Sequence, residues 1–197
     1  MRSTLRAVSD YQPPLFSASE LKGCYAVTPP AGSDLSPAAL IDWKQRIWQY
    51  QQQVRLQIPM QQASLFEPEI SLDPKVIDPL TLPRQNTEFW RWKAEDIGVS
   101  ALYFVIDYDL PVLLYVGETV KSNQRWKGEH DCKRYLLNYR QAHYQHGLAS
   151  TLGISFWAEA PTQTRPRQQL ERALIQKWRS PFNKENWQFW ATPFVNG

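Results

Sequence analysis

The chain has 197 residues, of which 43% are hydrophobic and 21% are charged. This is the composition of an ordinary globular protein with one core and room for a smaller appendage. No apolar run approaches the roughly 18 residues that a membrane span requires, so a transmembrane protein is excluded. No apolar segment follows Arg2 and Arg6, so a secretory signal is not expected and a cytoplasmic location is.

Charge differs between the two halves of the chain. Residues 98–197 contain 12 basic and 8 acidic residues, whereas residues 1–97 contain 10 and 11. The positive excess therefore belongs to the second half, which makes that half the better candidate for a polyanionic partner. Domains that bind no nucleic acid also reach such an excess, so charge alone does not identify the partner.

The first half of the chain has one clear element, a helix over about residues 36–57. Ser36 is a suitable N-cap and Pro37 a suitable first helical residue, whereas prolines interrupt the residues on either side. Apolar residues recur at three- and four-residue spacing at Leu40, Trp43, Ile47, Tyr50 and Val54. The stripe lasts only about two heptads, which favours a helix packed on the rest of the protein over a coiled coil.

The second half alternates short apolar runs with helical patterns. These predict a strand at 101–106, a strand at 112–117, a helix at about 123–144, a strand at 153–158 and a helix at 164–179. We therefore predict an α+β fold, in which a small three-stranded, mainly antiparallel sheet is flanked by helices. The expected domains are a proline-rich, wrapping or accessory extension over residues 1–97 and a compact domain over residues 98–197.

Glu171 occupies an unusual place in the last predicted helix. It lies in the middle of the apolar stripe formed by Leu174, Ile175 and Trp178. A carboxylate that loses its water there without a partner costs several kcal/mol, so it needs compensation. The residues alone leave three alternatives, which are an arginine–glutamate pair, a stripe edge that reaches solvent, and a metal ligand.

Four pieces of the second half stand in an order typical of one family. Ala101-Leu-Tyr103 is followed, after eleven residues, by Tyr115-Val-Gly117. Arg125-Trp-Lys127 comes next, and Glu171 precedes Pro181-Phe-Asn183. Over about residues 98–186 the chain thereby resembles the GIY-YIG nuclease superfamily, whose fold agrees with the predicted order of elements.

The resemblance implies hydrolysis of a phosphodiester with Mg²⁺ or Mn²⁺ held by Glu171. Tyr103 corresponds to the tyrosine implicated in activating the water, and Tyr115 would assist it by hydrogen bonding. A phenol ordinarily has a pKa of about 10, so the metal's hydration shell or a neighbouring cation must draw off its proton. Arg125 would hold the scissile phosphate in its planar fork, and Asn183 would orient the site through its amide.

Two members of the implied site are less regular. The implied catalytic set is Tyr103, Tyr115, Arg125, His130, Glu171 and Asn183, and the implied nucleic-acid contacts are Gly117, Arg125 and Lys127. His130 stands one residue further from Arg125 than the family's usual histidine or tyrosine, so a surface histidine is an equal alternative. Ala101 replaces the glycine of the first tripeptide, and its small methyl group is expected to have a modest effect.

Two segments of the first half follow a Gln-x-x-Leu-Phe pattern. It resembles the pentapeptide with which bacterial repair proteins bind the sliding clamp, and the residues concerned are Gln12, Leu15, Phe16, Gln62, Leu65 and Phe66. A Leu-Phe anchor can fill an apolar pocket of a partner. The alternative is that these residues tie extended segments onto the protein's own core.

Two functional hypotheses therefore stand. The first is a metal-dependent endonuclease that cleaves DNA in repair, restriction or mobile-element biology. The second is a non-catalytic adaptor on the same fold that binds nucleic acid or the sliding clamp. No residue of the implied catalytic set is missing from the sequence, which favours the endonuclease.

Overall fold

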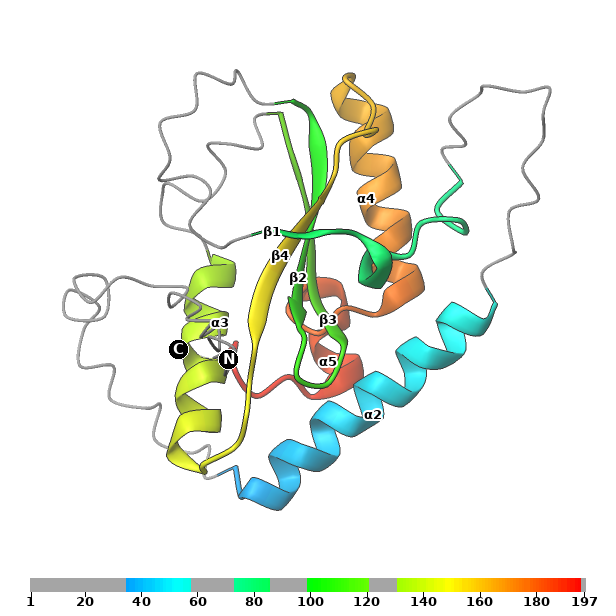
Figure 1. Ribbon diagram of the computed structural model, residues 1–197. Coiled ribbons are helices and arrows are strands. Elements are labelled where there is room, and N and C mark those ends of the chain that lie inside the picture. Colours follow the sequence, from blue (N-terminus) through cyan, green and yellow to red (C-terminus); the bar gives the residue numbers. More distant parts are fainter. Residues whose placement is uncertain (1–34, 58–72, 86–98, 121–130, 196–197) are drawn as a thin grey trace, which may run out of the picture.

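A computed structural model of the protein describes residues 35–57, 73–85, 99–120 and 131–195 (Figure 1). The helices and strands follow in the order α2 (Pro37–Leu56), η1 (Pro79–Thr81), β1 (Arg84–Gln85), β2 (Ala101–Asp107), β3 (Val112–Thr119), α3 (Asp131–Gln145), β4 (Leu152–Trp157), α4 (Thr164–Trp178), η3 (Lys184–Asn186) and α5 (Trp187–Trp190). The predicted α+β class is confirmed, with helices on both sides of a small sheet. The two Gln-x-x-Leu-Phe segments lie outside the described residues.

The sheet has four strands in the order β1-β4-β2-β3, so the prediction of three was wrong. All of its pairings are antiparallel. The additional strand, β1, is two residues long and pairs Arg84 with Ser155 and Gln85 with Ile154. Both of its residues are exposed and polar, so it has no alternation of apolar residues to predict it. The guanidinium of Arg84 lies 4.8 Å from the centre of the Tyr108 ring, which holds this edge in place.

The two faces of the sheet are covered by different helices (Figure 1). Tyr103 and Val105 of β2 point into a cluster with Leu136 and Tyr139 of α3. The alternate β2 residues Leu102, Phe104 and Ile106 pack instead with the α4 residues Leu170, Leu174 and Trp178. Because side chains alternate along a strand, β2 is buried on both faces, and every one of its residues is buried. We call these the α3 face and the α4 face.

Helix α2 packs against β3, the outermost described strand of the sheet, and against α4. Ser36 is its N-cap and accepts a hydrogen bond from the Ala39 backbone N–H at 3.2 Å, as its sequence predicts. Trp43 and Ile47 are buried in the same cluster as the α3 face. The indole N–H of Trp43 donates to the backbone oxygen of Trp190 in α5 at 3.0 Å. The amphipathic stripe therefore packs on the rest of the protein, as expected.

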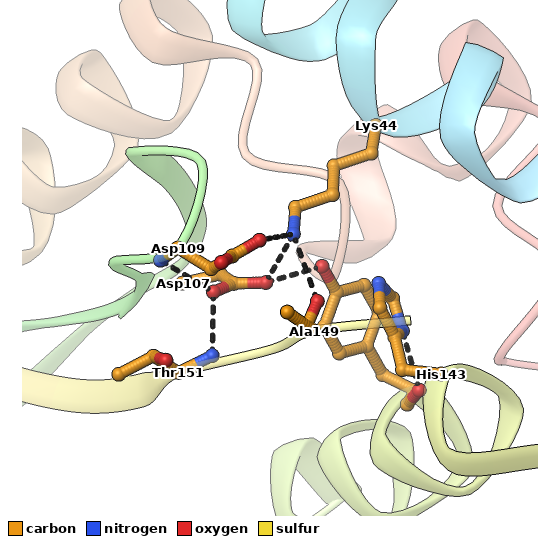
Figure 2. Close-up of polar contacts among 7 residues, drawn as sticks. Lys44, Asp107, Asp109, His143, Ala149 and Thr151 are labelled. Atoms are coloured by element: carbon orange, nitrogen blue, oxygen red, sulfur yellow. Dashed lines mark hydrogen bonds and ion pairs between the residues drawn. The ribbon is translucent and has the colours of Figure 1, made fainter. Parts of the chain in front are cut away.

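A buried polar network ties α2 to the hairpin and to α3 (Figure 2). Lys44 Nζ lies 2.8 Å from Asp107 Oδ2 and 3.3 Å from Asp109 Oδ2. The Tyr139 hydroxyl donates to Asp107 Oδ2 at 2.7 Å, and the Thr151 backbone N–H donates to Asp107 Oδ1 at 2.8 Å. Asp107 is fully buried, and these partners compensate the loss of its water. The network fixes the end of β2 that bears the hairpin turn.

Burial sets the protonation of two side chains beside this network. It raises the pKa of the Tyr139 phenol well above its usual value, and the nearby Asp107 charge adds to the effect. Burial also lowers the pKa of His143, whose Nδ1 lies 2.8 Å from the Tyr139 backbone oxygen. Both groups are therefore neutral near pH 7, and neutral His143 donates its Nδ1–H to that oxygen.

None of the helices in the described ranges is long and apolar enough to cross a membrane.

Candidate active site

Tyr103 and Tyr115 lie together on the two strands of the hairpin. Their rings are stacked, with centroids 5.9 Å apart and planes 29° apart. Phe156 of β4 lies on the other side, with its ring centroid 6.2 Å from that of Tyr103. Tyr103 is fully buried, whereas Tyr115 is partly exposed. The two tyrosines expected in the site therefore form one aromatic unit, of which Tyr115 reaches the surface.

A β-bulge brings Tyr115 to this face. Val105 is the partner of Tyr115 in the ladder and Ile106 is the partner of Leu113, so Leu114 is the extra residue of β3. Leu114 and Tyr115 consequently both pack on the α3 face. If β3 alternated regularly through Leu114, with no bulge, Tyr115 would turn towards the α4 face and away from Tyr103.

Gly117 makes room for the ring of Tyr103. The two residues are partners in the β2–β3 ladder. A Cβ atom at position 117 would overlap the hydroxyl end of the Tyr103 ring. The glycine of the second tripeptide is therefore required by the packing of the tyrosine from the first.

Asn183 is bonded to the backbone beside Tyr115. Its Oδ1 accepts the Val116 backbone N–H at 3.0 Å, and its Nδ2 donates to the Val116 oxygen at 2.9 Å. The Ser180 hydroxyl donates to the same Oδ1 at 2.6 Å. The amide therefore acts on β3 between Tyr115 and Gly117, and it is buried.

Glu171 lies on α4, which packs against β3 (Figure 1). Near the start of α4, Arg167 Nε binds Glu118 Oε2 at 2.6 Å. At its end, the side-chain amide of Gln51 donates to the Trp178 oxygen at 3.1 Å and to the Leu113 oxygen of β3 at 2.9 Å. Helix and strand therefore run in opposite directions, and Glu171 lies at the level of Val116 and Gly117. Its side chain is half-buried.

Arg167 and Glu118 were not expected in the site. Arg167 is fully buried, and its Nη1 donates to the backbone oxygens of Pro161 and Thr162, each at 2.9 Å. Its Nη2 is buried without a hydrogen-bond partner among the described residues. A signal did exist in the sequence, because Arg167 stands one helical turn before Glu171 on the same apolar stripe. Glu118 directly follows the second tripeptide.

Three of the expected site residues lie outside the described residues. These are Arg125, Lys127 and His130. The helix expected at about 123–144 is described from Asp131 to Gln145, as α3.

Among the described residues of the expected site, Glu171 could hold a metal ion. Within the described ranges, no three His, Cys, Asp or Glu side chains gather into a cage. Mg²⁺ retains several waters and is often bound by one or two carboxylates together with substrate phosphate. The half-buried Glu171 carboxylate fits that role.

Comparison with known proteins assigns the second half of the chain. Residues 100–186 match the model of the GIY-YIG catalytic domain. The C-terminal half therefore carries a GIY-YIG domain, a domain of nucleases. Neither the curated proteins nor the solved structures gave a match to the chain. The matched residues run from just before β2 to the end of η3, so α2, β1 and α5 lie outside the match.

Proposed function

We propose that the protein is a metal-dependent endonuclease that hydrolyses DNA phosphodiester bonds. The observation that carries this proposal is the stacked pair of Tyr103 and Tyr115, packed over Gly117 within the matched domain. Glu171 is half-buried on α4, the helix that packs against β3 and covers the other face of the sheet. The excess of basic over acidic residues in the second half agrees with a polyanionic substrate.

In the proposed reaction a water oxygen attacks the phosphorus of the scissile phosphate. Tyr103, after its phenol proton has passed to solvent, accepts the proton of that water as a phenolate, and Tyr115 hydrogen-bonds to Tyr103 or to the water. The bond from phosphorus to the leaving sugar oxygen breaks, and that oxygen takes a proton from solvent. Mg²⁺ or Mn²⁺ bound at Glu171 supplies Lewis-acid stabilisation of the charge on the phosphate and the leaving oxygen.

The protein's own contacts hold these groups in place. Arg125 is proposed to bind the scissile phosphate through its fork of donors. Asn183 keeps β3 fixed between Tyr115 and Gly117 through its paired bonds to Val116. Because positioning errors of about 1 Å can cost about 100-fold in rate, such a fixed strand supports catalysis.

The test compares Glu171→Gln with the parent protein. Plain, nicked and branched DNA are incubated with each protein in Mg²⁺ or Mn²⁺, and cleavage and DNA binding are measured separately. We expect Glu171→Gln to cleave at least about 100-fold more slowly than the parent, because charge in the transition state loses its compensation. The variant should still bind DNA. Glu159→Gln is the matched control, because Glu159 is exposed in the turn after β4.

One result would reject the endonuclease. If the parent protein binds these DNAs but cleaves none with either metal ion, and Glu171→Gln binds them equally well, a non-catalytic DNA-binding adaptor explains the protein better.

A further inference from the structure

Gln51 of α2 reaches β3 from outside the matched domain. Its side chain is fully buried. Its Nε2 donates to the Leu113 oxygen at 2.9 Å, and its Oε1 accepts the Leu113 backbone N–H at 2.8 Å. Nε2 also donates to the Trp178 oxygen at the end of α4, at 3.1 Å. One amide therefore joins α2, β3 and α4.

These bonds satisfy backbone N–H and C=O groups on the outer edge of the sheet. Among the strands that the structure describes, β3 is the last in the sheet order, so its outward N–H and C=O groups face no described strand. Gln51 bonds both backbone groups of Leu113, and Asn183 bonds both of Val116. The Phe182 backbone N–H donates to the Leu114 oxygen between them at 2.9 Å. The two amides therefore repeat the pairing that a further strand would provide.

Tyr115 lies between the two amides, next to the bulge. Gln51 bonds the residue before the extra residue Leu114, and Asn183 bonds the residue after Tyr115. A bulged strand can shift its register, and a shift by one residue turns each side chain to the other face. Bonds at both ends of this short segment oppose such a shift and keep Tyr115 stacked on Tyr103.

We propose that Gln51 is a positioning residue for Tyr115, and that α2 is part of the catalytic unit although the family model does not include it. The proposal rests on the proposed nuclease function. It assigns Gln51 no contact with DNA or metal, and its effect is exerted through the backbone of β3.

The test uses Gln51→Met in the full chain, with Ile47→Ala as the matched control. Methionine has a similar length but cannot exchange two hydrogen bonds with Leu113. Ile47 is buried one turn earlier on α2, so Ile47→Ala weakens the packing of the helix while leaving the amide in place. Three quantities are measured: cleavage as kcat and KM, thermal unfolding, and backbone hydrogen exchange at Leu113 and Val116.

We expect Gln51→Met to lower kcat by about 10- to 100-fold at temperatures well below unfolding, with KM nearly unchanged. Exchange at Leu113 should become faster in this variant, because its N–H has lost its acceptor. Ile47→Ala should lower the melting temperature and leave kcat within about twofold of the parent. A loss of kcat that follows stability in both variants would overturn the proposal.

A pH profile of Gln51→Glu adds a readout that stability alone does not produce. A protonated glutamic acid can still accept from the Leu113 N–H and donate to one of the two oxygens, of Leu113 or Trp178, whereas an ionised one has no donor for either. The ratio of kcat for Gln51→Glu to kcat for the parent should therefore rise as the pH is lowered. A ratio that stays flat would argue against these bonds as the cause.

Failure of this proposal can be told apart from failure of the nuclease function. If the parent cleaves DNA and Gln51→Met keeps its kcat, Gln51 is only structural. If the parent cleaves no DNA, the nuclease function fails, and with it any catalytic effect of Gln51. Hydrogen exchange at Leu113 is measured without substrate. If the exchange rate in Gln51→Met equals that of the parent, this result alone rejects the idea that Gln51 fixes β3.

Discussion

His143 makes the stability of the fold depend on pH. Burial is the largest cause of its lowered pKa, and the Lys44 charge acts in the same direction. The hydrogen bond to Tyr139 and the charges of Asp107 and Asp109 oppose the shift without cancelling it. The folded protein therefore binds a proton at His143 only below the ordinary pKa of about 6.5.

The sign of the pH effect follows from linkage. As the pH falls below about 6.5, the unfolded chain takes up a proton at this histidine before the folded chain does, so stability decreases. The loss continues until the pH reaches the lowered pKa of the folded state. Melting temperatures of the parent should therefore fall more steeply between pH 7 and pH 5 than those of His143→Gln, which carries no charge at either pH.

A matched variant separates this histidine from general acid effects. His146 is partly exposed just after α3, and His146→Gln should follow the melting curve of the parent. Equal pH dependence in His143→Gln and the parent would contradict the assignment of a neutral, buried His143.

At the scale of single residues, the sequence identified side chains through family spacing but not through packing. Tyr103 and Tyr115 were expected in one site, and their rings are stacked. Gln51 was not expected, because an amide that pairs with a distant strand leaves no local pattern. Asp107 was not singled out from the sequence, since its partners on α2 and α3 are remote in sequence.

At the scale of elements, α4 is fixed to β3 by the ion pair of Arg167 and Glu118. Arg167 is fully buried, and the Glu118 side chain is 22% exposed. Arg167→Met should lower the free energy of unfolding by about 3 kcal/mol, because the glutamate and two backbone oxygens lose their donor. Denaturant unfolding measures this change. Arg172→Met is the control on the same helix, where Arg172 is exposed and little change is expected.

A second measurement relates the same ion pair to the site. Because Arg167 stands one turn before Glu171, its loss should also weaken the stimulation of cleavage by Mg²⁺. An Arg167→Met protein as stable as the parent would show that the salt bridge does not hold α4.

The elements themselves were largely predictable. Helix α4, expected at 164–179, spans Thr164–Trp178, and the third predicted strand is β4 at Leu152–Trp157. Helix α4 was predictable because it buries one stripe, and β4 because it is a short apolar run whose first four residues are buried. β1 was missed because two exposed residues carry no periodicity, and the bulge at Leu114 was missed because it is defined by the partner strand.

At the scale of the whole molecule, α2 and the sheet share one core. The predicted fold class followed from the order of strands and helices, but the place of α2 did not, since an amphipathic stripe does not name the surface it covers. The boundary expected near residue 98 falls at the end of residues 86–98, outside the described residues, and it stays a prediction. Leu40, Trp43 and Ile47 of α2 nevertheless lie in the cluster of the α3 face, and Val54 lies in that of the α4 face.

Removal of α2 should therefore unfold the matched domain. Leu40, Trp43 and Ile47 are almost completely buried, and burial of each such side chain contributes about 1.5–3 kcal/mol. Their sum approaches the whole margin of about 5–15 kcal/mol by which domains are stable. A chain that begins at residue 58 should show no cooperative thermal transition by circular dichroism and should be degraded rapidly by proteases. A chain that begins at residue 35 is the control, because it differs from the shorter chain by α2. A cooperative transition of the shorter chain near the parent's melting temperature would show that residues 58–197 fold without α2, and that α2 is an appendage.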